Sequence, residues 1–567
     1  MTSPPAGQPG NQTSPYWGVL IICAVAQFMV VLDVSIVNVA LPAMRDALGL
    51  TITSQQWVVN AYTLAFAGFL MLGGRAADLF GRRRVFLAGL ALFIAASLLG
   101  GLAQSGAWLI AARAAQGLGG AVLAPTSLSL LTSTFTDPEQ RRRAMGVWSA
   151  TAASGAAVGV LGGGVLTDLL DWRWVLFVNV PIGLVMLAAA PRTLAESRGQ
   201  GPRARLDVAG AFTITAGLAL FVYGIVSTDT YAWSSPQTIA PLASGVALLL
   251  TALLIEARLA PSPLVPLGIF RRRSLVAANG IAMVIGAALF GMYFFISLYL
   301  QQAAGYGPLR TGLAILPAGI MSLVGSLAAS RLVARIGARR QLVLGPALSA
   351  AGLLWMSRLS FGDGYLQHML VPLAMFGLGI GTTFTPMTLT ATAGVPRAEA
   401  GLASGLVNAT RQVGGAVGLA VLATLAAGAT RHSAAYSSPA PVALTVGYDR
   451  AFLTAGLLLL AAAALALLIR SQAPDRPDIT PRRGRHRKPA EHDRLRALRD
   501  RPSRAGSPGH PLGAAVVRVY RSPTGIGSDS AIRHAGAWKG SAKYWVSWVT
   551  RSWANSMALT AYVGAPS

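Results

Sequence analysis

The sequence predicts an all-α integral membrane protein with about 14 membrane-spanning helices. Apolar residues make up 53% of the chain and charged residues only 12%, against roughly a quarter in soluble domains. Apolar runs of roughly 20 residues recur along the chain, and each is long enough to cross a bilayer. Arginine-rich loops alternate with arginine-poor loops, as expected when successive loops lie on opposite sides of a membrane.

Hydropathy and loop charge together place the spans. They are predicted at 17–42, 55–75, 85–105, 107–131, 142–167, 174–191, 207–227, 238–258, 275–302, 311–333, 340–358, 366–391, 402–428 and 449–470. Loops on one side carry roughly three times as many arginines as loops on the other. We therefore expect both termini in the cytoplasm and the chain in the cell's inner membrane.

Several other classes of function are not supported by the sequence. The net charge of +26 does not indicate nucleic-acid binding, because the arginines lie in short loops and in the tail after Arg470. The sequence contains no Walker-type loop, no HExxH segment and no His/Cys cluster, so we expect no cofactor, no metal and no enzyme activity. The single cysteine, Cys23, cannot form an intramolecular disulfide.

A polar loop rich in glycine and arginine follows the second predicted span, at residues 73–84. We predict that Asp78 and Arg82 act there as a cytoplasmic latch that is released as the protein changes state. The alternative is a static helix cap or loop salt bridge. The residues proposed for this gate are Gly73, Asp78, Gly81, Arg82 and Arg83.

An internal repeat relates the two halves of the chain. Residues 330–340 echo residues 74–84, with Gly337 opposite Gly81 and Ala334 opposite Asp78. Many transporters are built from repeated halves with a site between them near the middle of the membrane. The seventh and eighth spans lie between the halves and are predicted to be an insertion.

Asp33 is the strongest candidate for a functional residue, because it is the only carboxylate deep inside a predicted span. A medium of low dielectric opposes ionisation of an isolated carboxylate, and such residues usually mark ion or proton pathways. Arg113 lies at a similar depth in the fourth span and is the natural countercharge if the two spans are neighbours. Two alternatives stay open: a structural hydrogen bond from Asp33, or a static buried pair.

The fifth and sixth spans carry two further patterns. The fifth has glycines at spacings that give a groove for close helix packing, namely Gly146, Gly155, Gly159, Gly163 and Gly164. A generic packing face is the alternative to a role in transport. The segment 171–183, which begins Asp-Trp-Arg-Trp, is interpreted as structural anchoring, with its tryptophans at the outer membrane interface.

Taken in order, these segments resemble the motifs of the 14-span drug:proton antiporter subfamily of the major facilitator superfamily. The segments that carry the resemblance are 31–42, 73–84, 113–120, 146–164, 171–183 and 401–418. Val160 stands where the subfamily's fifth-span motif has proline. The resemblance implies a major facilitator fold, export rather than uptake, and roles for Asp33 and Arg113 in proton coupling.

The resemblance also implies an organisation of the chain into five parts. We expect a disordered N-terminus at 1–16, a six-helix half at 17–191, two inserted spans at 207–258, a second six-helix half at 275–470, and a basic, mostly disordered tail at 471–567. Aromatic, methionine and amide side chains would line a substrate cavity between the halves. The candidates are Trp57, Asn60, Tyr62, Tyr293, Phe294, Gln301, Met387, Asn408 and Gln412. Each of these could instead pack against lipid or a neighbouring helix.

The sequence thus favours export of an amphipathic drug or antibiotic in exchange for protons, by a protein expected to be a monomer. One alternative is an exporter of an endogenous metabolite or lipid. A second is a membrane sensor that keeps the fold but transports nothing. Uptake is a third, because a fold does not fix the direction of transport.

Overall fold

The computed structural model describes residues 14–198, 206–228, 230–259, 265, 267–360, 364–396, 399–435 and 439–469. These residues are almost entirely helical and contain no strand. The predicted tail at 471–567 and residues 1–13 of the predicted N-terminus lie outside the described residues.

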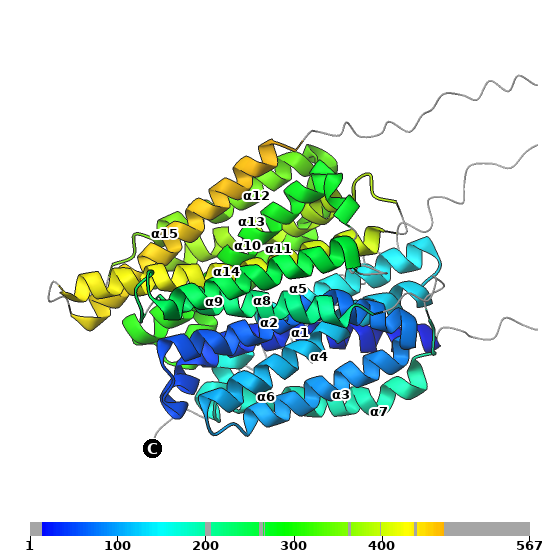
Figure 1. Cartoon of the computed structure of the whole chain (residues 1–567), viewed down its shortest axis with the longest axis horizontal. Helices are drawn as coiled ribbons and strands as arrows, with labels where there is room; N and C mark the ends of the chain where they lie inside the picture. The colour runs from blue at the N-terminus through cyan, green and yellow to red at the C-terminus, as the bar shows by residue number, and fades with distance from the viewer. Residues whose placement is uncertain are drawn as a thin grey trace, which may run out of the picture. The chain divides into compact units, whose positions relative to one another are not determined.

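The first group of helices, drawn from blue to cyan in Figure 1, precedes the two inserted spans. It comprises α1 (Ser14–Leu48), α2 (Ile52–Phe80), α3 (Arg82–Gly101), α4 (Gly106–Thr134), α5 (Pro138–Leu169), α6 (Trp174–Phe177) and α7 (Asn179–Thr193). The short α6 and α7 together occupy the sixth predicted span.

The second group follows the inserted helices α8 (Val208–Ser227) and α9 (Pro236–Leu254). It comprises α10 (Arg273–Leu298), α11 (Pro308–Ile336), α12 (Ala338–Met356), α13 (Val371–Thr392), α14 (Ala400–Ala435) and α15 (Ala440–Leu467). Three short π-helices and one 3₁₀-helix complete the described helices: η1 (Ile255–Leu259), η3 (Tyr299–Ala303) and η4 (Leu366–Leu370) are π-helices, and η2 (Leu267–Arg271) is the 3₁₀-helix.

The described helices occupy all of the predicted spans. Thirteen spans are long and apolar enough to cross a membrane, and α12 takes the remaining place although Arg339, Arg340 and Gln341 make its first turn polar. The last span begins at Ala440 rather than at 449, because Asp449 and Arg450 lie on the helix and not in the loop before it.

Helices pack mainly within each group, and a few contacts join the groups. In the first group α1 packs on α5 and α2 packs on α4; in the second, α10 packs on α14 and α11 packs on α13. Contacts of α5 with α11, of α2 with α14 and of α1 with α10 connect the two groups. The inserted α8 packs on α9 and also on α2 and α14, so it contacts both groups.

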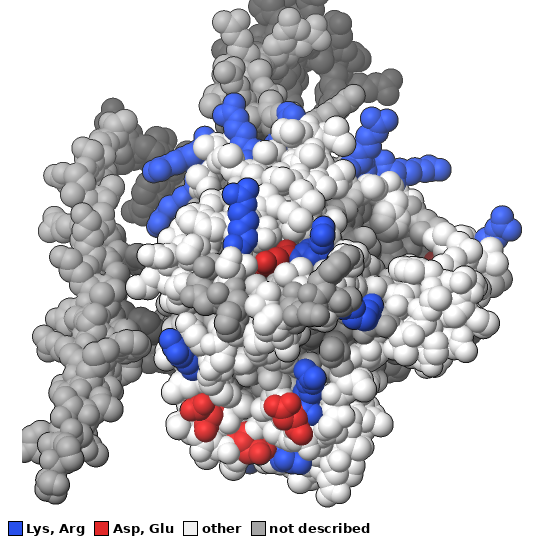
Figure 2. Space-filling view, turned by 90° about the vertical axis from the view of Figure 1, so that its left-hand side faces the viewer, with Lys and Arg blue, Asp and Glu red and all other residues white. Residues whose placement is uncertain are grey.

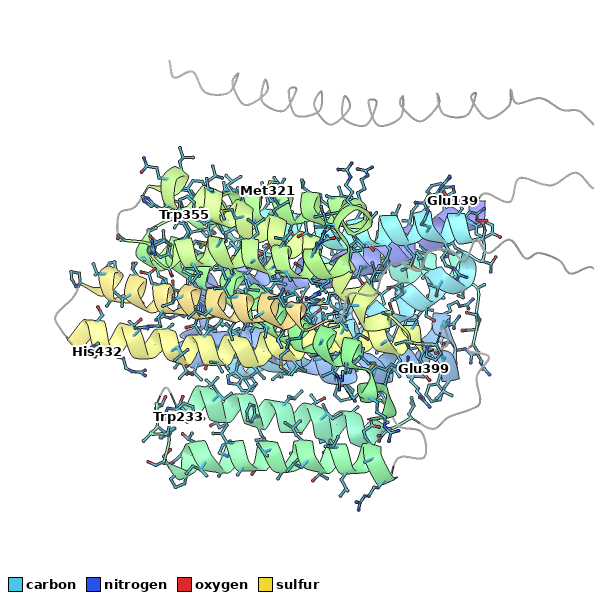
Figure 3. The ribbon with its side chains drawn as sticks, turned by 90° about the horizontal axis from the view of Figure 1, so that it is seen from above. Glu139, Trp233, Met321, Trp355, Glu399 and His432 are labelled. Atoms are coloured by element: carbon cyan, nitrogen blue, oxygen red, sulfur yellow. The ribbon has the colours of Figure 1, made fainter. Side chains whose placement is uncertain are left out.

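The two ends of the bundle can be named by residues labelled in Figure 3. Glu139 and Glu399 lie at one end, here called the Glu139 end, while Trp233, Trp355 and His432 lie at the other, here called the Trp233 end. The face viewed in Figure 2 carries both basic and acidic side chains, and most of the acidic ones in view lie in its lower part.

The internal repeat appears as two one-residue connections of the same kind. Gly81 joins α2 to α3 with φ of +107°, and Gly337 joins α11 to α12 with φ of +84°. The backbone N–H of each glycine donates to the helix that ends there, at Ala77 and Val333 respectively. Side chains other than glycine rarely adopt such φ values, so the repeated glycines fix the same sharp reversal in both groups.

The predicted orientation can be tested with introduced cysteines, because Cys23 is buried. Trp233→Cys and Glu399→Cys place thiols at exposed positions on opposite ends of the bundle. On intact cells, a membrane-impermeant maleimide should label Trp233→Cys and leave Glu399→Cys unlabelled, because loops that share the arginine-rich side face the cytoplasm.

In everted vesicles the two labelling results should exchange. The wild-type chain, with Cys23 alone, is the control and should stay unlabelled until denatured. Labelling of Glu399→Cys on intact cells would mean that the predicted orientation is reversed.

Candidate functional site

The structure brings Asp33 and Arg113 into direct contact. Asp33 lies on α1 and Arg113 on α4, and Nη1 of the guanidinium is 2.5 Å from Oδ2 of the carboxylate. The second carboxylate oxygen, Oδ1, accepts hydrogen bonds from the amides of Gln116 at 2.6 Å and Asn179 at 3.1 Å. Three donors from two other helices therefore surround one carboxylate.

The guanidinium of Arg113 is held by further contacts. Nε donates to the carbonyl oxygen of Val58 on α2, at 3.2 Å, and Nη1 also donates to the Gln116 side chain at 2.6 Å. The ring of Tyr62 lies beneath the guanidinium, 4.5 Å from Cζ to the ring centre. Gln116 in turn donates to Ser97 on α3, at 2.7 Å. The network thus joins α1, α2, α3, α4 and α7.

The Asp33–Arg113 pair is sealed from solvent and from lipid. The Asp33 side chain is 0% exposed and that of Arg113 is 2% exposed. The other ion pairs of the described residues lie near the ends of helices and are more exposed: Asp78–Arg82, Glu196–Arg84, Glu139–Arg142, Glu139–Arg143 and Asp171–Arg173. Burial of opposite charges without water is costly unless both are well bonded, as they are here.

The glycines of α5 pack against the segment of α1 that carries Asp33. A methyl group at Gly155, Gly159 or Gly163 would meet the backbone of α1 at Phe28, Leu32 or Ile36, at 3.0, 2.8 and 2.6 Å. Small residues allow two helix backbones to approach this closely.

The other two glycines of the predicted set have different surroundings. Gly164 faces the second group, where a methyl group would lie 2.7 Å from the carbonyl oxygen of Pro308 on α11. Gly146 has open space around its Cα. Only the middle of the predicted set therefore contacts α1.

The segment 171–183 is held by contacts within the protein. Trp174 is 48% exposed, but Trp172 is 2% exposed and packs beneath the guanidinium of Arg173, so only one tryptophan can lie at an interface. Asn179 belongs to the Asp33 network, which the sequence analysis did not predict. The signal was available, because an amide inside an apolar span needs a partner.

The predicted gate residues are tied to the segment that follows α7. Arg82 pairs with Asp78 at 3.0 Å, and the backbone N–H of Arg83 donates to the Glu196 carboxylate at 3.2 Å. Gly81 lies against the same carboxylate. Gly73 has a separate role, because its Cα packs on the backbone of α4 at Ala121. Within the described residues, these bonds keep the loop on the first group of helices and do not reach the second.

The nine predicted cavity residues fall into different environments. Tyr62 belongs to the Asp33 network, and Trp57 packs towards Tyr223 on α8, with ring centres 6.4 Å apart. Phe294 and Met387 are buried in the large apolar core that spans both groups, and Tyr293 packs against it. Sequence reasoning could not tell these faces apart, because it did not give the facing direction of each helix.

The remaining four carry polar side chains. Asn60 is 0% exposed, and neither its amide nitrogen nor its amide oxygen has a hydrogen-bond partner in the structure. Gln412 is 5% exposed, Asn408 accepts from Arg411 at 2.7 Å, and Gln301 contacts α1. The structure does not gather the nine residues around one described hollow.

The two groups of helices are joined near the Trp233 end by bonds to α1. Pro42 has no N–H, so the carbonyl oxygen of Asn38 lacks its usual helical donor. The Ser297 hydroxyl on α10 donates to that oxygen at 2.9 Å. The Gln301 amide in η3 donates to the Val39 carbonyl oxygen and to the Ser297 hydroxyl, each at 3.0 Å. These bonds close the two groups together on the helix that carries Asp33.

Two groups of membrane-length helices, related by an internal repeat and with a buried charge pair inside the first group, define the architecture of a secondary transporter. The sequence profile of the Major Facilitator Superfamily matches residues 23–419. The chain belongs to the major facilitator superfamily.

Its relatives include proteins named for antibiotics. The chain is 42% identical to the cephamycin export protein CmcT of Amycolatopsis lactamdurans, over 82% of this chain and 95% of that protein. It is 42% identical to the puromycin resistance protein pur8 of Streptomyces alboniger, over 84% and 96%. It is 32% identical to the tetracenomycin C resistance and export protein of Streptomyces glaucescens, over 81% and 92%.

A solved structure supports the same fold at low sequence identity. It is a bacterial homolog of the human lysosomal transporter Spinster, in an inward-facing and unoccupied conformation. The TM-score is 0.57 and the identity 15%, over 81% of this chain and 97% of that one.

Breaking the buried pair should cost far more than breaking an exposed one. Arg113→Gln alone leaves the Asp33 carboxylate without its countercharge, and we expect a loss of about 3 kcal/mol in the free energy of unfolding. The double variant Asp33→Asn/Arg113→Gln should recover much of that loss, because no unpaired charge remains. Unfolding of the purified protein in detergent measures both values.

The exposed pair Glu139–Arg142 provides the control, since its side chains are 50% and 74% exposed. Arg142→Gln should change stability by less than about 1 kcal/mol. Additive losses in the double variant of the buried pair would contradict a coupled ion pair.

Proposed function

We propose that the chain exports amphipathic drugs or antibiotics across the cell membrane in exchange for protons. The observation that carries this proposal is the Asp33 carboxylate, fully enclosed and held by Arg113. Ionisable residues inside a membrane are expensive, and those facing a bundle interior mark ion or proton pathways. The names of the relatives support antibiotics as the class of substrate.

Proton exchange would act through the bonds around Asp33. Protonation of the carboxylate removes its negative charge and weakens the ion pair with Arg113, which then needs other acceptors. A change in these hydrogen bonds would alter the contacts of α1, α2, α4 and α7 together, because each of these helices contributes a bonded group. Protonation and substrate binding would each favour a different access state, which is what antiport requires.

The bonds from Ser297 and Gln301 to α1 would hold one of those states. They lie on the helix that carries Asp33, one to two turns nearer to the Trp233 end. If that end faces outward, as the arginine distribution predicts, the described conformation is closed to the outside. We further propose that the protein acts as a monomer in the inner membrane, with both termini in the cytoplasm.

Proton-driven export should depend on Asp33. Asp33→Asn cannot ionise, so everted vesicles containing this variant should not accumulate a cephamycin, puromycin or tetracenomycin C that the wild type accumulates under a proton gradient. Flux down a substrate gradient should remain. Radiolabelled substrate uptake measures both.

Asp46→Asn is the matched control, because Asp46 is an exposed carboxylate near the end of the same helix. It should accumulate substrate like the wild type. Gradient-driven accumulation by Asp33→Asn at the wild-type rate would contradict the proposed coupling role.

Closure at the Trp233 end should weaken when its hydrogen bonds are removed. Ser297→Ala/Gln301→Ala removes the bonds to α1, which we expect to contribute about 2 kcal/mol in total. The ratio of open to closed molecules should rise by roughly 30-fold. Spin labels at Ala47→Cys and Ala304→Cys, one on each group of helices, would report the separation by pulsed electron resonance.

Ser357→Ala is the control, because the Ser357 hydroxyl donates to Leu354 in its own chain segment and not across the groups. It should leave the distance distribution unchanged. An unchanged distribution in the double variant would show that these bonds do not hold the closure.

A further inference from the structure

A second arginine lies inside the bundle, and none of the described carboxylates forms an ion pair with it. Arg411 is the twelfth residue of α14, about 16 Å along the helix from Ala400. Its guanidinium donates to the Asn408 side-chain oxygen at 2.7 Å. Among the ion pairs of the described residues, none involves Arg411, whereas Arg113 in the other group is paired with Asp33.

The surroundings of Arg411 place it inside the bundle. Its backbone packs on α10, where a methyl group at Gly286 would overlap the Arg411 carbonyl oxygen. The Phe384 ring on α13 lies beside the guanidinium, with Cζ 5.6 Å from the ring centre. One turn and a half towards Ala400, Gly405 lies against Met71 of α2, in the first group. Arg411 therefore lies where α14 contacts α10 and α13, near its seam with α2.

The three side chains leave capacity for a ligand. Arg411, Asn408 and Phe384 are each only partly buried. A guanidinium has five N–H donors, of which the Asn408 oxygen accepts one. Glu399 directly precedes α14 and lies about 18 Å from Arg411 along the helix axis. Among the described residues, no carboxylate forms an ion pair with Arg411.

We propose that Arg411, Asn408 and Phe384 form a subsite for the carboxylate of an amphipathic anionic substrate. The guanidinium binds the carboxylate in its planar, two-bond geometry, and Asn408 holds the guanidinium in place. The Phe384 ring packs against the apolar part of the same substrate. This inference rests on the proposed export function and names its substrate class.

The chemistry favours a carboxylate over a neutral or cationic group. A charged hydrogen bond inside a medium of low dielectric is stronger than a neutral one, and a cationic group would be repelled by Arg411. An acid should thus bind about tenfold tighter than its amide. The phosphate of an anionic lipid shares this chemistry and must be separated from substrate by the test.

The test compares dansyl-leucine with dansyl-leucinamide, which differ only in carboxylate against carboxamide. Binding to the full-length protein in phosphatidylcholine nanodiscs is read from dansyl fluorescence. The wild type should bind the acid about tenfold tighter. Arg411→Gln should bind both equally, Arg411→Lys should keep part of the preference, and Phe384→Leu should weaken both probes alike.

Arg450→Gln is the matched control, because Arg450 is exposed on α15. It removes the same charge elsewhere and should keep the full preference. Thermal unfolding of each variant verifies that the fold is intact. Acid preference retained by Arg411→Gln, or equal or absent binding of the two probes to the wild type, would overturn the subsite.

A second arm replaces part of the phosphatidylcholine with phosphatidylglycerol. Unchanged acid preference supports a substrate site, whereas loss of the preference in the wild type would assign Arg411 to lipid phosphate and overturn the proposal. If the amide is transported under a proton gradient and the acid is not bound more tightly, the carboxylate subsite is contradicted but the export proposal stands. If the acid is bound more tightly but neither probe is transported under a proton gradient, the export proposal is contradicted but the subsite stands.

Discussion

The ion pair between Asp33 and Arg113 is the constraint on which the first group of helices depends. Two oppositely charged side chains lie inside a membrane bundle. Nη1 of Arg113 is 2.5 Å from Oδ2 of Asp33, and both side chains are buried. Such a pair is tolerated only when the remaining bonding capacity of both groups is used. Val58, Gln116 and Asn179 provide those bonds, and each comes from a different helix from that of Asp33.

The helix that carries Asp33 connects this pair to the rest of the bundle. On one side, α5 approaches α1 closely because Gly155, Gly159 and Gly163 have no side chains. Further along the helix, Pro42 leaves the carbonyl oxygen of Asn38 without its helical donor, and the Ser297 hydroxyl of the second group donates to that oxygen. A change at the carboxylate would therefore act on the same rigid element that closes the two groups at the Trp233 end. This continuity supports coupling between proton binding and access.

Much of this could be predicted from sequence because the signals are local. Apolar runs fix the spans, and a lone carboxylate and a lone arginine at similar depth identify Asp33 and Arg113 as candidates. The shared reversals at Gly81 and Gly337 also follow from the repeat. The contribution of Asn179 was missed because its segment was interpreted by its tryptophans alone. The burial of Trp172 was not predicted, because hydropathy does not show which side chains of a connecting turn are covered.

Other features needed the structure, since they depend on which helices are neighbours. The gate loop could not be assigned a partner from sequence, and the structure bonds it to Glu196, a distant residue of the same group. The contacts of α8 with both α2 and α14 could likewise be seen only in the structure. Arg411 lies in segment 401–418, which contributed only to the resemblance, because the absence of Arg411 from the ion pairs of the described residues becomes visible only when neighbouring helices are placed.

The most direct test of the central claim is proton release when substrate binds. Purified protein in weakly buffered detergent solution, with a pH-sensitive dye, would be mixed with a transported antibiotic near the pH at which half of the sites are protonated. The account predicts release of up to about half a proton per substrate bound by the wild type, because half of the sites carry a proton at that pH, and none by Asp33→Asn, because Asp33 is the group that exchanges. Equal release by the wild type and Asp33→Asn would contradict it.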